Sequence, residues 1–419
     1  MFKNHPRGMM WLFFTEMWER FGFYTLMAIL TIYMERILGF DDSYKGDVYG
    51  IFLGMVYFIP LLGGWMADRL FGQLPTVLAG AVFMFVGFVS LGLSSLDNLV
   101  FFYGGLGCVA FGTGIFKVNI ATLVGNLYEK KRALKDAGFN IYYMGVNVGA
   151  TVAPLVATVI SFQAAFFTAA FGMLLSIGIF LKGKNDLIFT DYKTMVAAKK
   201  DNTAEDIPKS EFIQRILTLC ILFIIVIFFW IGFYQNGFAL TLFAERSTIE
   251  LDWLKPQTYQ FFNPFFILLL TPLLLRFLSN LNKKGKEPST PVKIFIGMLI
   301  MGIAMVIMVP ASMMGGNLDQ PIMSPGWLIS TYLFVTLAEI MISPMGLSYV
   351  SKVAPVKVQG LMMGGWFVAT ALGAYGSGLI GKYYSDFAHS EYFMILTGIL
   401  AFSAVLAFVF MGKLKRFAG

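Results

Sequence analysis

Two glutamates and an arginine share one turn of a long apolar segment near the start of the chain. Glu16, Glu19 and Arg20 form the pattern Glu-x-x-Glu-Arg. Spacings of three and four residues would place Glu16 beside both of the others on one face of a helix. Two carboxylates that share one guanidinium leave a surplus negative charge, so one of them should hold a proton more readily than an isolated glutamate does. The pattern predicts a proton-binding site; the alternative is a static ion cluster that fixes helix packing.

Two further charges, Lys117 and Glu339, also stand inside apolar segments. An ionisable side chain at the centre of a membrane helix costs about 2.5–3.5 kcal/mol on insertion scales. We therefore expect these five residues to be paired or hydrated along a polar pathway. The alternative for Lys117 and Glu339 is a charge pair that latches two parts of the chain together, and a ligand could break and replace such a pair.

The composition is that of a membrane protein. The 419 residues are 58% hydrophobic and 13% charged, whereas a soluble domain carries about 25% charged residues. This excludes a water-soluble enzyme, a disordered protein and a nucleic-acid-binding module. The two cysteines, Cys108 and Cys220, and the two histidines, His5 and His389, lack the spacing of a redox pair, a metal site or a catalytic triad. We expect no enzymatic activity, no metal and no cofactor, with protons as the coupling ion.

Apolar segments of about 20 residues recur along the chain, a length that indicates membrane helices rather than barrel strands. They lie near residues 11–34, 48–67, 75–95, 99–124, 138–160, 163–181, 216–243, 256–275, 294–313, 325–351, 360–381 and 392–412. The expected fold is an all-α polytopic membrane protein with about twelve transmembrane helices. We expect two six-helix halves over 1–181 and 216–419, joined by a linker over 182–215. A short helix on the membrane surface is expected over 192–200.

Lysine and arginine are distributed unevenly between alternate loops. With the N-terminus inside, the cytoplasmic segments hold 24 of the 31, the opposite side holds five and the spans hold two. The positive-inside rule then places both termini in the cytoplasm. The net charge of +7 is therefore interpreted as a sign of topology and not of nucleic-acid binding. The expected location is the plasma (inner) membrane.

One loop favours a particular superfamily. The run Gly63-Gly64-Trp65-Met66-Ala67-Asp68-Arg69 lies between the second and third segments and ends at Gly72. It resembles the short loop motif of the major facilitator superfamily. Its glycines would permit a tight turn, and Asp68 and Arg69 would cap and clamp neighbouring helix ends in a gating role. The alternative is a polar loop without a gating role.

Along nearly its whole length the chain resembles the proton-dependent oligopeptide transporters, a family of that superfamily. Its first-helix motif resembles Phe14-Thr15-Glu16-Met17-Trp18-Glu19-Arg20-Phe21-Gly22-Phe23-Tyr24, and its fifth-helix signature resembles Phe139-Asn140-Ile141-Tyr142-Tyr143-Met144-Gly145-Val146-Asn147-Val148-Gly149 with Pro154. Further resemblances follow in order at Gly112 to Asn119 (with Val118 where proline is usual), Phe229-Trp230 to Gln235, Asn263-Pro264, Glu339 to Pro344, and Gly365-Trp366-Phe367.

The resemblance implies a peptide site with two charged ends. In the family, residues matching Arg20 and Lys117 receive the peptide carboxylate, and the glutamate matching Glu339 receives the amino terminus. Residues matching those that assist or line the pocket are Tyr24, Tyr57, Asn147, Trp230, Asn263 and Trp366. The residues expected to couple protons are Glu16, Glu19, Arg20 and Glu339. The residues expected to gate are Lys117, Glu339, Met27, Tyr234, Asp68 and Arg69. For the aromatic residues, packing within the helix bundle is the alternative.

The chain departs from the family pattern at two positions that commonly pair across the outer mouth. The family often has an arginine where Met27 stands and an acid where Tyr234 stands. Their joint absence avoids a lone buried charge, which would be costly. We therefore expect the outer gate of this protein to close by aromatic and apolar contact.

The expected function is proton-coupled symport of di- and tripeptides into the cytoplasm, by alternating access between the two halves. One alternative is a symporter of another small zwitterion or peptide-like metabolite. A second is a transceptor that binds its ligand without moving it. We expect a monomer surrounded by membrane lipid, with a di- or tripeptide as substrate and no nucleic acid as partner.

Overall fold

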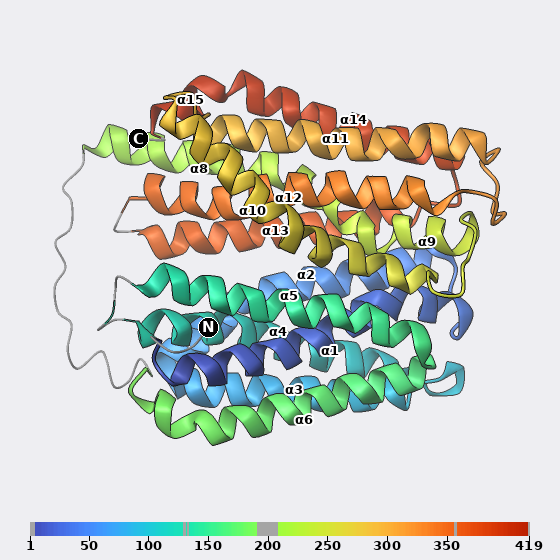
Figure 1. Cartoon of the computed structure of the whole chain (residues 1–419), viewed down its shortest axis with the longest axis horizontal. Helices are drawn as coiled ribbons and strands as arrows, with labels where there is room; N and C mark the ends of the chain where they lie inside the picture. The colour runs from blue at the N-terminus through green and yellow to red at the C-terminus, as the bar shows by residue number, and fades with distance from the viewer. Residues whose placement is uncertain (1–4, 129–130, 132–133, 191–207, 356–357, 418–419) are drawn as a thin grey trace. The chain divides into compact units, whose positions relative to one another are not determined.

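The computed structural model describes residues 5–128, 131, 134–190, 208–355 and 358–417. Long helices joined by short loops account for most of these residues (Figure 1). The chain divides into two compact units. Unit 1 consists of Met1–Phe40 and Met55–Asp201, and unit 2 consists of Asp41–Gly54 and Asn202–Gly419. Helix α2 (Asp42–Met66) therefore begins in unit 2 and ends in unit 1.

Unit 1 is built from five whole helices and the second part of α2. They are α1 (Gly8–Arg36), α3 (Gln73–Gly92), α4 (Leu99–Leu127), α5 (Lys135–Val159) and α6 (Phe162–Leu187), with a π-helical turn η1 (Ala67–Phe71) and 3-10 turns η2 (Leu96–Asn98) and η4 (Ile188–Thr190). Helix α1 packs against α5 and α6, while α3 packs against α4 and α6. The charged turn of α1 is thus enclosed by neighbouring helices.

Two glycines of α5 allow that helix to lie directly on the charged turn of α1. A Cβ atom on Gly149 would lie 2.9 Å from the backbone nitrogen of Phe21 and 3.2 Å from Cβ of Arg20. A Cβ atom on Gly145 would lie 3.0 Å from the carbonyl oxygen of Phe13. Only glycine fits such an approach without displacing a neighbour. Gly145 and Gly149 therefore permit close packing of α5 on α1.

Unit 2 contains the first part of α2 and the helices that follow the linker. They are α8 (Lys209–Phe233), α9 (Ala239–Arg246), α10 (Phe262–Lys283), α11 (Thr290–Met314), α12 (Pro325–Val353), α13 (Gln359–Gly381), α14 (His389–Val409) and α15 (Met411–Arg416), with 3-10 turns η6 (Tyr234–Gly237) and η7 (Pro256–Phe261). Helix α11 packs against α12 and α14, α8 packs against α13 and α14, and α10 packs against α12.

Each predicted apolar segment coincides with a helix, in some cases with a flanking turn as well, and segments 216–243 and 392–412 run on into α9 and α15. Among the described residues, ten helical segments are long and apolar enough to cross a membrane. Helices α1 and α13, of 29 and 23 residues, are long enough but fall outside that group. The buried charges of α1 lower its hydropathy, and the many glycines of α13 have the same effect.

The helices on either side of the linker are longer than predicted. Helix α6 continues to Leu187, and α8 already begins at Lys209. The short helix expected over 192–200 lies outside the described residues. The predicted boundaries of the two halves, at 181 and 216, stay predictions.

The glycines of the Gly63–Arg69 motif do not form the tight turn that we expected. Gly63 and Gly64 lie inside α2, and the chain turns only at Gly72, where φ is 89°. A Cβ atom on Gly63 would lie 2.7 Å from Cα of Ile115 on α4, and the Asn119 amide donates a hydrogen bond of 3.0 Å to the Gly63 carbonyl. Gly63 therefore serves close packing between α2 and α4.

The charged pair of the same motif lies in the π-helical turn η1, and both side chains are exposed. The Asp68 carboxylate accepts a hydrogen bond of 3.1 Å from the side chain of Gln73, the first residue of α3. Asp68 thus bonds a side chain of the next helix, whereas the backbone at the start of α3 has no side-chain cap. A gating role for Asp68 and Arg69 stays a prediction.

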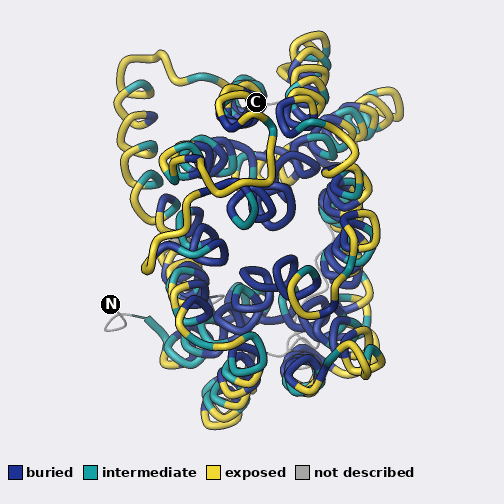
Figure 2. Tube along the Cα trace, turned by 90° about the vertical axis from the view of Figure 1, so that its right-hand side faces the viewer, coloured by how far each residue is buried: buried dark blue, intermediate teal, exposed yellow. Residues whose placement is uncertain are grey.

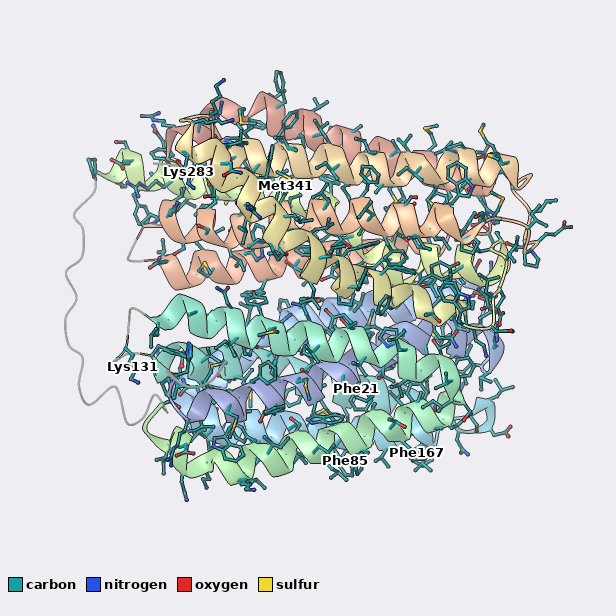
Figure 3. All side chains as sticks on the ribbon, in the orientation of Figure 1. Phe21, Phe85, Lys131, Phe167, Lys283 and Met341 are labelled. Carbon is teal, nitrogen blue, oxygen red and sulfur yellow. The ribbon has the colours of Figure 1, made fainter. Side chains whose placement is uncertain are left out.

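Many large apolar side chains are exposed on the outside of the helices. Buried and exposed residues alternate along the same helices (Figure 2). Phe21 on α1 is 5% exposed and lies inside unit 1, whereas Phe167 on α6 is 43% exposed and points outward (Figure 3). An extensive exposed apolar surface is unfavourable in water and suits the hydrocarbon of a bilayer.

Candidate functional site

The Glu-x-x-Glu-Arg motif forms a buried ion cluster on α1. The exposed fractions of the side chains of Glu16, Glu19 and Arg20 are 1%, 0% and 4%. Arg20 donates to Glu19 through both Nε and Nη2, and the Nη2–Oε1 distance is 2.6 Å. The Arg20 Nε atom also lies 3.3 Å from Oε1 of Glu16. The prediction that two carboxylates share one guanidinium is confirmed.

Glu16 and Glu19 share the guanidinium of Arg20 less evenly than their spacing suggested. The bidentate partner of Arg20 is its sequence neighbour Glu19, and adjacent residues do not normally face each other on a helix. Helical spacing fixes the direction of the Cβ atoms only, and the long arginine side chain folds back within the packed interior. Glu16 makes one ion-pair contact, and its second oxygen, Oε2, is buried without a hydrogen-bond partner. Glu16 is therefore the carboxylate with room to bind a proton.

Two residues from other helices act on Glu16. The hydroxyl group of Tyr142, a buried residue of α5, interacts with the Glu16 carboxylate. Lys117 on α4 interacts electrostatically with Glu16, and its Nζ lies 4.9 Å from the ring centroid of Tyr57. Sequence reasoning did not select Tyr142. The spacing of three residues to Gly145, which contacts α1, was the available signal that Tyr142 faces α1.

The other predicted site residues of unit 1 do not all lie at the ion cluster of α1. Tyr24, one turn beyond Arg20, is close enough to interact electrostatically with it. The side-chain amide of Asn147 donates 2.8 Å to the carbonyl of Tyr143 in its own helix, so the structure does not bring Asn147 into the ion cluster. Met27 is a buried apolar residue, 7% exposed. The substrate-binding and gating roles of these residues stay predictions.

In unit 2, the carboxylate of Glu339 has uncharged hydrogen-bond partners, unlike the carboxylates of the ion cluster on α1. Asn263 on α10 donates to Oε2 of Glu339 on α12 at 2.7 Å and to the Thr336 hydroxyl at 3.2 Å. Thr336 in turn donates 2.7 Å to the carbonyl of Tyr332. Within the described part of unit 2, no lysine or arginine forms an ion pair with Glu339. Thr336 was missed by sequence reasoning, although it lies one turn before Glu339 on the same helix face.

Two predicted site tryptophans of unit 2, Trp366 and Trp230, differ in whether a polar atom remains available to a ligand. Trp366 is 2% exposed, and its ring lies over Gly346, where any side chain would overlap it. The buried position of Trp366 agrees with the alternative that its ring packs within the helix bundle. Trp230 stacks on Tyr234 with ring centroids 5.5 Å apart, and its buried Nε1 atom has no hydrogen-bond partner. Trp230 therefore retains a donor that a bound molecule could use.

A group of charged residues at the start of α2 is largely buried within unit 2. Asp42, at the start of α2, accepts from Arg246 Nη1 and Nη2 at 2.9 and 2.7 Å. Asp42 also contacts Lys45 Nζ at 2.7 Å and the Ser385 hydroxyl. The side chain of Lys45 is 0% exposed. We call these four residues the Asp42 cluster. The sequence did not reveal this cluster, because Arg246 and Ser385 lie 204 and 343 residues from Asp42 in the chain.

Glycines and an aromatic residue attach the first part of α2 to the rest of unit 2. A Cβ atom on Gly46 would lie 2.6 Å from the carbonyl oxygen of Gly378 on α13. Tyr49 donates a hydrogen bond of 2.9 Å to the carbonyl of Tyr234, and its ring contacts Phe238 at 5.4 Å. The ring of Tyr234 itself contacts Trp230 and Phe233, and the Asp42 cluster adds ion pairs to the same segment of α2.

Comparison with known proteins decides the family. The sequence profile described as the POT family matches residues 74–200 and 190–396. The chain belongs to the POT family. A di-/tripeptide transporter of Lactococcus lactis subsp. cremoris is 30% identical to this POT family member, over 95% of this chain and 93% of that protein. Dipeptide and tripeptide permease B of Xenorhabdus bovienii is 27% identical, over 88% and 85% of the two chains.

Solved structures of the POT family agree with the fold. A crystal structure of a peptide transporter in complex with alafosfalin matches this POT family member with a TM-score of 0.89 and 26% identity, covering 100% of this chain and 96% of that one. A POT family transporter in complex with 5-aminolevulinic acid matches with a TM-score of 0.85 and 26% identity, over 99% and 98%. The protein is thus a multi-pass, all-α membrane protein with the fold of the POT transporters.

Proposed function

We propose that this POT family member carries di- and tripeptides into the cytoplasm together with protons. The observation that supports the proposal most strongly is the separation of charge between the two units. Unit 1 holds the cations Arg20 and Lys117 beside two carboxylates, and unit 2 holds Glu339, which pairs with no cation among the described residues of that unit. A peptide is a zwitterion, and its two ends require a cationic and an anionic partner.

The proposed cycle uses the ion cluster of α1 as the proton site. Protonation of Glu16 removes one of the negative charges that Arg20 contacts, so the guanidinium becomes more available to the peptide carboxylate, together with Lys117. Glu339, oriented by Asn263, receives the peptide ammonium group. Alternating access between two halves then releases peptide and proton on the other side. In this proposal the protein is a plasma-membrane monomer with cytoplasmic termini, and protons are its only coupling ion.

The test is uptake of radiolabelled dialanine by proteoliposomes that contain the purified protein. An inward proton gradient is expected to drive accumulation, and a protonophore is expected to abolish it. Counterflow of labelled dialanine against a high internal concentration separates transport from binding alone, because a transceptor would bind the peptide and give no counterflow. Absence of both accumulation and counterflow would contradict the proposal.

A second candidate substrate class is supported by one comparison. The similar POT family transporter with bound 5-aminolevulinic acid has a ligand that is a small zwitterion without a peptide bond. We therefore propose this class as the alternative. Direct uptake decides between the two: a peptide carrier is expected to accumulate labelled dialanine, whereas a carrier confined to small zwitterions without a peptide bond is expected to accumulate labelled 5-aminolevulinic acid and no dialanine.

Glu339→Gln is expected to weaken peptide binding by about 10–100-fold. This range corresponds to the loss of a charge-assisted hydrogen bond of about 1.5–3 kcal/mol. The amide side chain can still accept a bond from Asn263, so the local packing should persist. The measurement is the half-saturation concentration for dialanine in counterflow.

The matched control for Glu339→Gln is Glu287→Gln. Glu287 is a partly exposed glutamate of unit 2 that pairs with Lys293. It is expected to leave half-saturation unchanged. Equal half-saturation in Glu339→Gln and the wild type would remove Glu339 from the proposed ammonium site.

A further inference from the structure

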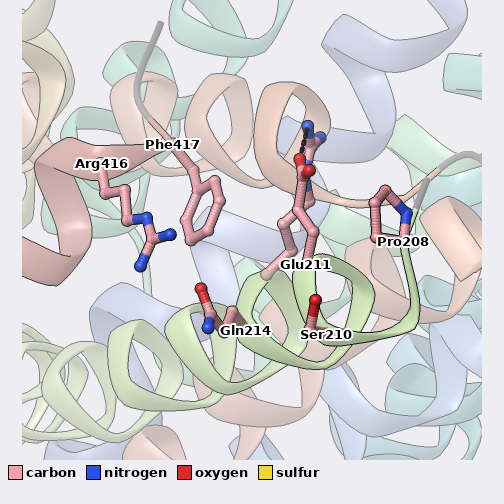
Figure 4. A pocket seen from close by; sticks show the side chains of 7 residues that line it. Pro208, Ser210, Glu211, Gln214, Arg416 and Phe417 are labelled. Carbon is pink, nitrogen blue, oxygen red and sulfur yellow. Dashed lines mark hydrogen bonds and ion pairs between the residues drawn. The ribbon is translucent and has the colours of Figure 1, made fainter.

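A polar cavity lies where the start of α8 meets the last helix of the chain. Its volume is about 510 Å³. From α8 and the residue before it, Pro208, Ser210, Glu211, Gln214 and Arg215 line the cavity, and Arg416 and Phe417 line it from the end of α15. Arg416 and Phe417 reach toward Gln214 across the opening (Figure 4). All of these residues belong to unit 2, and none of them is used in the proposed transport cycle.

The cavity carries one uncompensated positive charge. Arg215 donates to Oε1 of Glu211 at 2.9 and 2.7 Å, so these two charges neutralise each other. The ring of Phe417 lies between two guanidinium groups, 5.6 Å from Cζ of Arg215 and 5.4 Å from Cζ of Arg416. No carboxylate among the described residues pairs with Arg416. Its hydrogen-bonding edge therefore stays available to an anion.

The cavity lies at a boundary between apolar and basic surface. On α8, the exposed residues Ile213 and Leu217 lie among the lining residues and just after them. On α14, Phe408 and Val409 are 67% and 65% exposed. The next helix, α15, has only basic residues as its charged residues, at Lys413, Lys415 and Arg416. Exposed apolar residues that end in a cluster of basic residues mark the level of the lipid headgroups.

We propose that this cavity binds the headgroup of an anionic membrane phospholipid. Arg416 would hold the phosphate, because a guanidinium presents two parallel donors to phosphate oxygens. The Ser210 hydroxyl and the Gln214 amide would hydrogen-bond the hydroxyl groups of a glycerol headgroup. A choline headgroup lacks such hydroxyls, and its cation would approach the guanidinium groups. The acyl chains would lie along the exposed apolar residues of α8 and α14.

The test measures thermal unfolding of the purified protein in neutral detergent while lipid is added. Phosphatidylglycerol is expected to raise the unfolding temperature more than phosphatidylcholine or inorganic phosphate at equal concentration. In Arg416→Gln, the phosphatidylglycerol concentration at half-effect is expected to rise about tenfold, equivalent to about 1.4 kcal/mol. Gln214→Leu, which keeps every charge, is expected to weaken the effect of phosphatidylglycerol as well.

The matched control is Lys286→Gln, which removes a basic residue from the exposed loop after α10. It is expected to respond to phosphatidylglycerol as the wild type does. An unchanged half-effect in Arg416→Gln would overturn the proposal. An equal rise with inorganic phosphate would also overturn it, because the site would then recognise a free anion and not a lipid. Neither result depends on peptide transport.

Discussion

Glu16→Gln is expected to reduce proton-driven accumulation of dialanine to the background of empty liposomes while counterflow exchange remains measurable. Glutamine has nearly the same shape as glutamic acid, but it cannot bind and release a proton. Its carbonyl oxygen can still accept hydrogen bonds from Arg20 and Tyr142, which contact Glu16 in the wild type. The substitution should therefore uncouple the proton from the peptide without dismantling α1. The measurement compares accumulation and counterflow in the same proteoliposomes.

Two further substitutions make this result specific. Glu19→Gln takes the charged bidentate partner from Arg20, so it is expected to impair accumulation too; full accumulation would contradict a shared proton site. Glu35→Gln changes a glutamate of the same helix that lies outside the ion cluster, and it should accumulate dialanine normally. Normal accumulation by Glu16→Gln would show that the coupling proton binds elsewhere.

The helices could be predicted closely because a bilayer leaves the backbone few options. Each polar backbone group that enters hydrocarbon must be bonded within its own segment, so apolar length alone indicates a helix. The same reason explains the error at Gly63 and Gly64. Glycine permits a turn, but α2 continues through both residues and uses Gly63 for contact with α4. Sequence shows that a glycine is present, whereas packing decides what it is used for.

The candidate site was predictable only where its members share one helix. The sharing of Arg20 by Glu16 and Glu19 followed from their spacing. The contact of Tyr142 with Glu16 required α5 to pack on α1, and the bond from Asn263 to Thr336 required α10 to pack on α12. Rotamer choice in the packed interior also gave Glu19 the bidentate contact with Arg20. The spacing of residues along one helix determines neither the contacts between helices nor the bidentate contact of Glu19 with Arg20.

The Asp42 cluster leads to the largest expected effect on stability. Asp42→Asn is expected to lower the free energy of unfolding by about 3–5 kcal/mol, the usual cost of removing one partner from a buried ion pair. The carboxylate of Asp42 contacts both Arg246 and Lys45. Asparagine would keep the shape and remove the negative charge, so two cations would lose their shared partner in a site that water reaches poorly. The measurement is unfolding in detergent by heat or by denaturant.

Asp47→Asn provides the matched comparison on the same helix. Asp47 pairs with Lys382 at 3.1 Å, but the two side chains are 41% and 25% exposed. The hydrogen bond from Lys382 to Asp47 raises the pKa of the lysine, yet both charges remain hydrated when the pair is broken. Exposed pairs contribute little to stability, so this variant should unfold almost as the wild type does. Similar losses in Asp42→Asn and Asp47→Asn would mean that burial does not set the strength of the Asp42 cluster. A large loss in Asp42→Asn alone would identify this cluster as the main polar attachment of α2 to unit 2.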